Sequence, residues 1–177
     1  MYWLRALLLL GSTIAIAQSP EAVQRFQIDA QNGDANAAFW LGVAYRDANG
    51  VTRDLTRAVE WLSRSAGAGN PDAADALGQL YEDGIGVHRD SSRAATLYRF
   101  ACEQRPDHGG AGHGCNDLGL LYLEGRGVVQ DKVEAYKYFR LSRSEVALSD
   151  LRPDLTPDQI AEGERRVRDW HRVHPER

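Results

Sequence analysis

Residues 73–94 read AADALGQLYEDGIGVHRDSSRA, and this stretch decides the fold because its main positions recur in two further copies. The copies are offset by 36 and then by 41 residues. The recurring features are a leucine-glycine pair, a tyrosine, a glycine, an aspartate and an alanine, at 41–42, 45, 50, 54 and 58, at 77–78, 81, 86, 90 and 94, and at 118–119, 122, 127, 131 and 135. Such a fixed period predicts a chain built from three similar units.

Each copy has the pattern of a helical hairpin, and its first helix is the clearest part. In the middle copy Ala73, Leu77, Leu80 and Tyr81 follow one another at spacings of four, three and one. These spacings place the four residues on one side of a helix. Gly78 lies beside this apolar stripe, where the missing side chain lets a neighbouring helix approach closely and offsets the cost of a glycine within a helix.

The turn and the second helix carry different signals. Gly84 and Gly86 suit the left-handed conformation that is favoured at the end of a helix. Asp90 has the acceptor side chain of an N-cap, and a second apolar-periodic run extends from there to about Cys102. This second helix completes the hairpin.

Single helices are expected on both sides of the three hairpins. Residues 19–21, Ser-Pro-Glu, have the N-cap, the first-position proline and the first-turn acid of a helix that extends to about Asn32. Residues 156–159 have the pattern of a capping box. Because the ends of a stacked array must be covered, both helices are predicted to be caps. The predicted fold class is all-α, a superhelical α/α solenoid of eight helices with no sheet.

The N-terminus has the features of an export signal. Arg5 supplies a positive start, residues 6–17 are largely apolar, and Ala-Ile-Ala at 15–17 fits a cleavage site. We therefore expect cleavage after Ala17 and a periplasmic or secreted location. The whole chain has 21 Lys and Arg against 25 Asp and Glu. It has no basic run for nucleic acid, and no further apolar run of the roughly 20 residues that a membrane span needs.

The repeat unit resembles the Sel1-like repeat, a relative of the tetratricopeptide repeat, over about Asp34 to Arg143. Two positions depart from the pattern: Ala48 replaces the first turn glycine in the first copy, and Gly114 replaces the leading alanine in the third. The resemblance implies an α/α superhelix that serves as a scaffold for binding proteins or peptides, linked in exported bacterial members to the envelope or secretion. The signal, the N-terminal cap, the three repeats, and a linker with the C-terminal cap are then expected at 1–17, 18–33, 34–69, 70–110, 111–147 and 148–177.

Two interpretations are open for the two cysteines. Cys102 ends the second helix of the middle copy and Cys115 opens the next helix, and such a pair in an exported chain is typical of a disulfide. The resemblance implies the same pairing, because secreted cysteine-rich Sel1-like proteins carry linked cysteines at these positions. Alternatively, Cys102, His108, His113 and Cys115 are four potential zinc ligands, although their spacing matches no common zinc finger. The disulfide is preferred, and no metal or other cofactor is predicted.

Catalytic motifs are missing from the sequence. It has no H-E-x-x-H, G-x-S-x-G or Walker motif, and the glycine pairs of the turns follow no apolar strand. The resemblance suggests one alternative, since some cysteine-rich Sel1-like proteins are described as penicillin-binding or weakly β-lactamase active. Neither Ser91 nor Ser92 has a lysine three residues later, so a non-catalytic scaffold is preferred.

A partner-binding row follows from helix geometry. If the repeated leucine, glycine and tyrosine face the stack, positions at −5, −2, +2 and +5 from the leucine lie on another side of the first helix, and stacking aligns them. In related repeats the first helices line the concave groove. The row consists of Phe39, Val43, Arg46, Asp75, Gln79, Glu82, Asn116, Leu120 and Leu123. Its central acids and apolar ends favour a cationic or amphipathic partner, and the protein is expected to bind it as a monomer.

Two alternatives to this row stay open. Phe39, Leu120 and Leu123 are as well explained by packing against flanking helices, whereas the central acids Asp75 and Glu82 are expected to face water. The convex face is also a possible binding surface.

Overall fold

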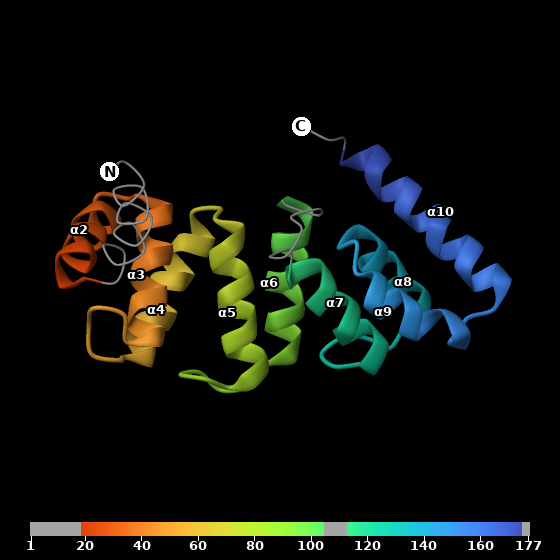
Figure 1. The fold of residues 1–177 in the computed structure, drawn as a ribbon, viewed down its shortest axis with the longest axis horizontal. Coiled ribbons are helices and arrows are strands. Elements are labelled where there is room, and N and C mark those ends of the chain that lie inside the picture. Colours follow the sequence, from red (N-terminus) through yellow and green to blue (C-terminus); the bar gives the residue numbers. More distant parts are fainter. Residues whose placement is uncertain (1–18, 105–112, 175–177) are drawn as a thin grey trace, which may run out of the picture. The chain divides into compact units, whose positions relative to one another are not determined.

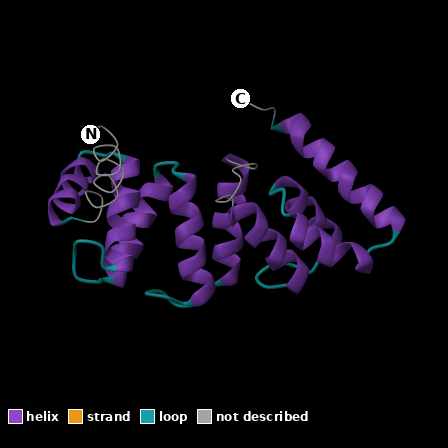
Figure 2. Cartoon of the chain, in the orientation of Figure 1, coloured by secondary structure: helices purple, strands orange, loops and turns teal. Residues whose placement is uncertain are grey.

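The computed structural model describes residues 19–104 and 113–174, and every regular element within these ranges is a helix (Figure 1, Figure 2). The predicted all-α repeat fold is therefore confirmed. The expected export signal lies outside the described residues. The elements are α2 (Pro20–Gln31), α3 (Ala35–Asp47), α4 (Leu55–Gly67), α5 (Pro71–Asp83), α6 (Ser91–Gln104), α7 (His113–Glu124), α8 (Lys132–Leu141), α9 (Glu145–Leu151), the 3-10 helix η1 (Arg152–Asp154) and α10 (Pro157–Val173).

The chain forms two compact units. The first holds the described residues up to Ala73 together with Ile85–Val87, and the second holds Ala74–Gly84 and the chain from His88 onward. The core of the first unit joins Val23 of α2 to the leucine and tyrosine of α3 and to Ala58 of α4. The second unit has one core cluster around Tyr98 and Leu118 and another where α8 meets α9.

The glycine after the repeated leucine faces a large side chain of the second helix in every hairpin. The pairs are Gly42 with Leu62, Gly78 with Tyr98, and Gly119 with Phe139. A Cβ at these glycines would lie 2.7, 2.6 and 2.5 Å from that side chain, which is closer than packed atoms approach. The prediction that glycine here permits close helix packing is confirmed.

Each hairpin is closed at its turn by the repeated aspartate. The backbone N–H of Asp90 donates to the carbonyl of Tyr81 over 2.8 Å, while its carboxylate accepts from the N–H of Arg93 at 3.0 Å. The same backbone bond joins Asp54 to Tyr45 and Asp131 to Tyr122, at 3.0 Å in both copies. The predicted N-cap is confirmed, and the aspartate both starts the second helix and fixes its distance from the first.

The second glycine of the turn meets the preceding repeat. Gly127 has φ +70°, and a Cβ there would lie 2.3 Å from the backbone carbon of Ser91. The Ser92 hydroxyl donates to the Gly127 carbonyl over 3.1 Å. Glycine is therefore needed for both backbone conformation and space, and the turn becomes the contact between successive hairpins.

The predicted caps both form. The Ser19 hydroxyl accepts from the N–H of Ala22 at 3.2 Å and starts α2. Both hydrogen bonds of the capping box between Thr156 and Gln159 are present at the start of α10. Gly163 of α10 packs on the Tyr136 ring of α8, which repeats the glycine contact of the hairpins.

The expected count of eight helices is wrong, because the described residues form nine α-helices. The additional element is α9, which begins at the end of the expected third repeat (111–147) and, with η1, continues into chain expected to be linker. Leu148 and Leu151 of α9 are buried against α8 together with Leu155. Burial of three leucines stabilises this short helix, although Ser144 makes no side-chain capping hydrogen bond.

Candidate partner-binding surface

The first-unit part of the predicted row lies on α3. Phe39, Val43 and Arg46 are all half-buried. The Phe39 ring is 5.0 Å from that of Trp40, which remains 49% exposed. Arg46 is held by two 2.8 Å hydrogen bonds to Asp47, so its charge is compensated within the same helix.

The centre of the row lies on α5 and is less exposed to water than expected. Gln79 donates to Asp75 at 3.4 Å. Glu82 accepts a hydrogen bond from the Tyr98 hydroxyl at 2.8 Å and forms an ion pair with Arg126, which leaves its side chain 17% exposed. Burial, together with the bond to Glu82, raises the pKa of the Tyr98 phenol. Glu82 therefore joins α5 to α6 and to the turn of the next repeat instead of facing solvent.

The last three positions of the row, Asn116, Leu120 and Leu123 of α7, line a pocket of about 320 Å³. Leu120 and Leu123 also pack against the core cluster of α8 and α9. Each leucine therefore contacts a flanking helix, as the packing interpretation predicts, and also borders open space, as the partner-binding interpretation predicts.

The opposite wall of the pocket comes from α9 and its neighbours. The short helix and the chain around it complete the lining, with Phe139, Ser144, Val146, Ala147, Asp150, Leu151 and Asp154. Val146 at this wall is 76% exposed. The sequence pattern did not reveal this wall, because residues 144–147 were expected at the end of the third repeat and residues from 148 onward in a linker. The spacing of Leu148, Leu151 and Leu155, at i, i+3 and i+7, is a helical signal that marks it.

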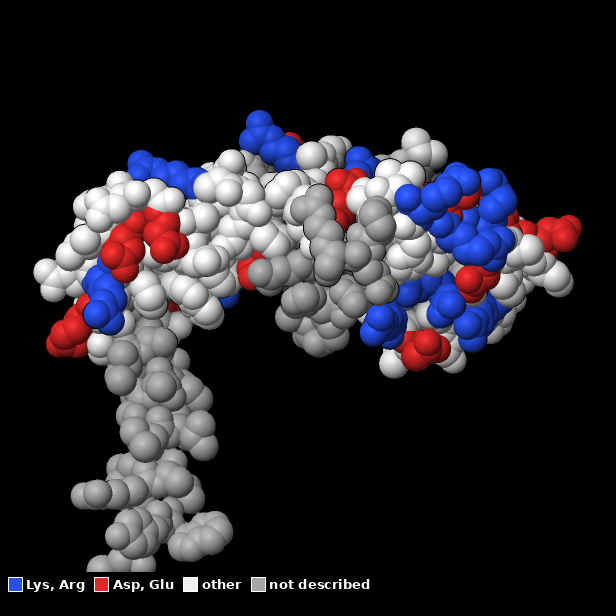
Figure 3. All heavy atoms as spheres, turned by 90° about the horizontal axis from the view of Figure 1, so that it is seen from above, with Lys and Arg blue, Asp and Glu red and all other residues white. Residues whose placement is uncertain are grey.

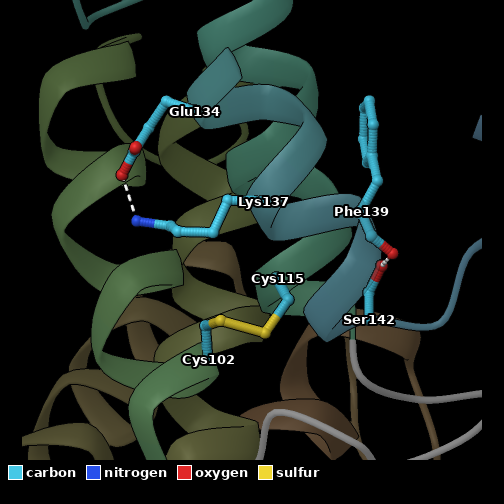
Figure 4. The surroundings of a disulfide bond; sticks show 6 residues. All are labelled: Cys102, Cys115, Glu134, Lys137, Phe139 and Ser142. Carbon is cyan, nitrogen blue, oxygen red and sulfur yellow. Dashed lines mark hydrogen bonds and ion pairs between the residues drawn. A yellow bond between two sulfur atoms is a disulfide. The ribbon is translucent and has the colours of Figure 1, made fainter. Parts of the chain in front are cut away.

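The disulfide prediction is confirmed. Cys102 of α6 and Cys115 of α7 are bonded, with an S–S distance of 2.00 Å and a Cα–Cα distance of 4.6 Å (Figure 4). Both residues are buried, so the bridge is part of the core between the second and third repeats. Bonded sulfurs are not thiolate ligands, which removes two of the four ligands of the zinc alternative; His108 lies outside the described residues. The bridge is consistent with an extracytoplasmic location.

The serines considered for a β-lactam site have structural contacts. Ser91 lies against Gly127, and the Ser92 hydroxyl donates to the carbonyl of that glycine. Within 19–104 and 113–174 no three His, Cys, Asp or Glu residues gather as metal ligands, and no helix is long and apolar enough to cross a membrane. No observation in the structure favours the β-lactam alternative.

Basic side chains gather toward the C-terminal end of the second unit, with acidic ones among them (Figure 3). Arg165 of α10 pairs with Glu162 at 2.7 Å and with Asp169 at 3.2 Å, and Arg172 pairs with Asp169 at 3.2 Å. Because Arg165 and Arg172 have acidic partners on the same helix, they are part of a mixed charged surface.

The same hairpin recurs three times, with the same closing hydrogen bond and the same glycine contact, so the protein is an α-helical repeat protein. The family model of the Sel1 repeat matches residues 35–70, 71–105 and 112–144, more than half of the chain. The chain therefore belongs to the Sel1 repeat family, whose members are generally scaffolds for protein interaction.

Solved structures with this fold include three informative relatives. A protective antigen of uropathogenic Escherichia coli strains, with an SLR fold, is 35% identical at a TM-score of 0.63, over 70% of this chain and 25% of that one. A Sel1 repeat protein from Oxalobacter formigenes is 29% identical at 0.64, over 71% of this chain and 50% of that one. The cysteine-rich protein B of Helicobacter pylori, 23% identical at 0.52 over 80% of this chain and 91% of that one, shares the fold.

This chain thus spans between a quarter and a half of the length of the first two relatives. No curated protein matches it.

Proposed function

We propose that this protein is a non-catalytic scaffold that binds a protein or peptide outside the cytoplasm through the pocket between α7 and α9. The observation that carries this proposal is a pocket at Asn116, Leu120 and Leu123, three positions of the predicted partner-binding row. The general role of Sel1 repeat proteins in protein interaction also supports a binding function. Phe39, Val43 and Arg46 stay predictions for a further contact surface.

The pocket has the physical character of an anchor site for side chains. A volume of about 320 Å³ lies at the lower end of the roughly 300–1,000 Å³ typical of ligand pockets. Leu123, Phe139 and Leu151 give it apolar walls, and exposed Val146 extends the apolar surface outward. Burial of one leucine-sized side chain in such a pocket contributes about 1.5–3 kcal/mol.

Site-specific photocrosslinking tests the binding role. A photoreactive amino acid is placed at Val146, which lines the pocket, or at Val173 of α10, which is 70% exposed and does not line the pocket. In the source bacterium we expect one discrete adduct from position 146, and its loss when Leu123→Asp is added. Equal adducts from both positions would contradict the pocket as the binding site.

The location is tested by the mass of the exported protein. We propose that residues 1–17 direct export and are removed, which would allow the disulfide to form in an oxidising compartment. The protein recovered from the cell envelope or medium should begin at Gln18. Recovery of the uncleaved chain in the cytoplasm, with free thiols, would contradict this part of the proposal.

The non-catalytic character is tested with a β-lactam substrate. The purified protein with its disulfide intact should hydrolyse nitrocefin no faster than a heat-denatured sample. Turnover that depends on the folded protein would contradict the proposal, and loss of that turnover in Ser92→Ala would place the activity at the second-helix start.

A further inference from the structure

The pocket between α7 and α9 has an uncompensated acidic rim. Among the described residues that line it, the charged ones are Asp150 and Asp154, and none is Lys or Arg. Asp154 is paired with Lys132 at 2.8 Å. Asp150 is exposed and makes no ion pair with any described residue. The negative charge at the rim that is free to act on a ligand is therefore that of Asp150.

This placement differs from the charge pattern expected from sequence. The sequence pattern predicts that a cation is recognised at the centre of the row, by Asp75 and Glu82. Glu82 is engaged by Arg126 and by the Tyr98 hydroxyl, and its side chain is only 17% exposed. Its charge is therefore compensated before any partner arrives. Asp75 is half-buried and accepts a hydrogen bond from Gln79, whereas Asp150 of α9 is exposed.

We infer that the segment recognised at this pocket carries a bulky apolar side chain next to a lysine or arginine. This inference rests on the proposed function and specifies its partner. The apolar side chain enters between Leu120, Leu123 and Leu151, and the adjacent cation pairs with Asp150 at the rim. The apolar contact supplies most of the affinity, while the charge pair selects the sequence and sets its direction.

Other occupants would lack either the apolar contact or the charge pair. An acidic segment would bring like charges together at Asp150, and a purely polar segment would leave the leucine walls without apolar contact. A second copy of this chain is the remaining occupant. If a second copy occupies the pocket, the protein should form dimers without any peptide, and the sample used for the peptide titration also tests this.

The experiment uses three capped octapeptides with the same Gly-Ser flanks and the central pairs Leu-Arg, Leu-Glu and Ser-Arg. Each is titrated into the isotope-labelled mature chain, and the backbone amide signals of α7 and α9 are followed by NMR. We expect the Leu-Arg peptide to shift these signals and to bind about fivefold or more tightly than either of the others.

A charge-reversal variant and a matched control identify the rim residue. Asp150→Lys should weaken binding of the Leu-Arg peptide about tenfold and strengthen binding of the Leu-Glu peptide. Asp29→Lys changes an exposed aspartate of α2 in the first unit and should change neither affinity. Unchanged amide signals elsewhere in each variant report that the fold is intact.

The outcomes separate this inference from the proposed function. Equal binding of the Leu-Arg and Leu-Glu peptides would overturn the charge pairing and leave the binding role standing. Absence of any shift in α7 and α9 with all three peptides would count against the proposed function itself. Dimers formed without peptide, and lost in Val146→Arg but not in Val173→Arg, would assign the pocket to a second copy and overturn the inference.

Discussion

Ala48 ends α3 with φ 60°, in the left-handed conformation that an L-residue other than glycine adopts at a cost. The equivalent residues of the other two copies are Gly84, with φ 73°, and Gly125, with φ 72°. All three copies therefore keep the same turn, although only two have the residue suited to it. The first hairpin carries local strain that the packing of α3 and α4 offsets.

Substitution of this alanine should stabilise the first unit. Ala48→Gly relieves the left-handed conformation, and after subtraction of the larger chain entropy of unfolded glycine it should raise the free energy of unfolding by about 0.5–1 kcal/mol. Urea denaturation measures the change. Ala68→Gly is the matched control, because Ala68 is exposed in the same unit and ends α4 with φ −85°. An equal gain from Ala68→Gly would show that the effect does not arise from the backbone conformation.

Helix α10 shows how a terminal element is held. Its Arg166 donates to Asp131 at 3.0 Å and to Glu134 at 2.8 Å, so the cap is tied to the N-cap and first turn of α8. Partial burial raises the pKa of Asp131, but the backbone N–H of Glu134 and the Arg166 guanidinium outweigh it and hold that pKa below its ordinary value. The ionised aspartate is therefore the form that the folded state favours.

Loss of this arginine should weaken the cap in a pH-dependent way. Arg166→Met should lower the free energy of unfolding at pH 7 by about 1–2 kcal/mol, because it leaves carboxylates facing one another. Because the pKa of Asp131 is lower in the folded than in the unfolded protein, its ionised carboxylate stabilises the folded state above the unfolded-state pKa, near pH 4. This contribution is lost as the pH falls through the folded-state pKa. The difference from wild type should therefore shrink below about pH 4. Arg165→Met, on an exposed part of the same helix, is the control and should change stability by less than about 0.5 kcal/mol at either pH.

The elements that could be predicted are those whose residues repeat. The hairpins, their aspartate caps and the capping box follow from patterns that recur or have a local mechanism, and so does the glycine contact. α9 does not recur, and its local signal is the spacing of Leu148, Leu151 and Leu155, of which Leu155 lies beyond the helix, so repeat patterns do not predict it. Four of the ten residues that line the pocket lie on this helix, so the sequence pattern predicted one wall, at Leu120 and Leu123, and not the other. The ion pair between Glu82 and Arg126 could not be predicted from the sequence either, because it joins residues from successive repeats.

Across the whole molecule, stability is distributed over contacts between neighbours. In the second unit the Gly127 turn rests on the start of α6, and the disulfide joins α6 to α7. In the first unit the Gly86 turn lies against Leu55 of α4, where a Cβ would lie 2.8 Å from the leucine side chain. Within each unit, these contacts join elements of successive hairpins. In such an array, loss of one contact acts locally.

Removal of the disulfide tests this distribution. Cys102→Ala with Cys115→Ala opens a bridge between residues 13 apart in sequence, and should lower the stability of the second unit by about 3 kcal/mol in the loop-entropy model. Hydrogen exchange with mass spectrometry should then show amides of α7 and α8 exchanging about a hundredfold faster, since each 1.4 kcal/mol is tenfold. Amides of α3 should exchange at the wild-type rate. Wild-type protein with a reduced bridge is the control that separates loss of the covalent bond from the effect of the smaller alanine side chains. Equal acceleration of exchange in α3 would contradict local contacts between neighbours, because it would show that all the repeats unfold as one cooperative block.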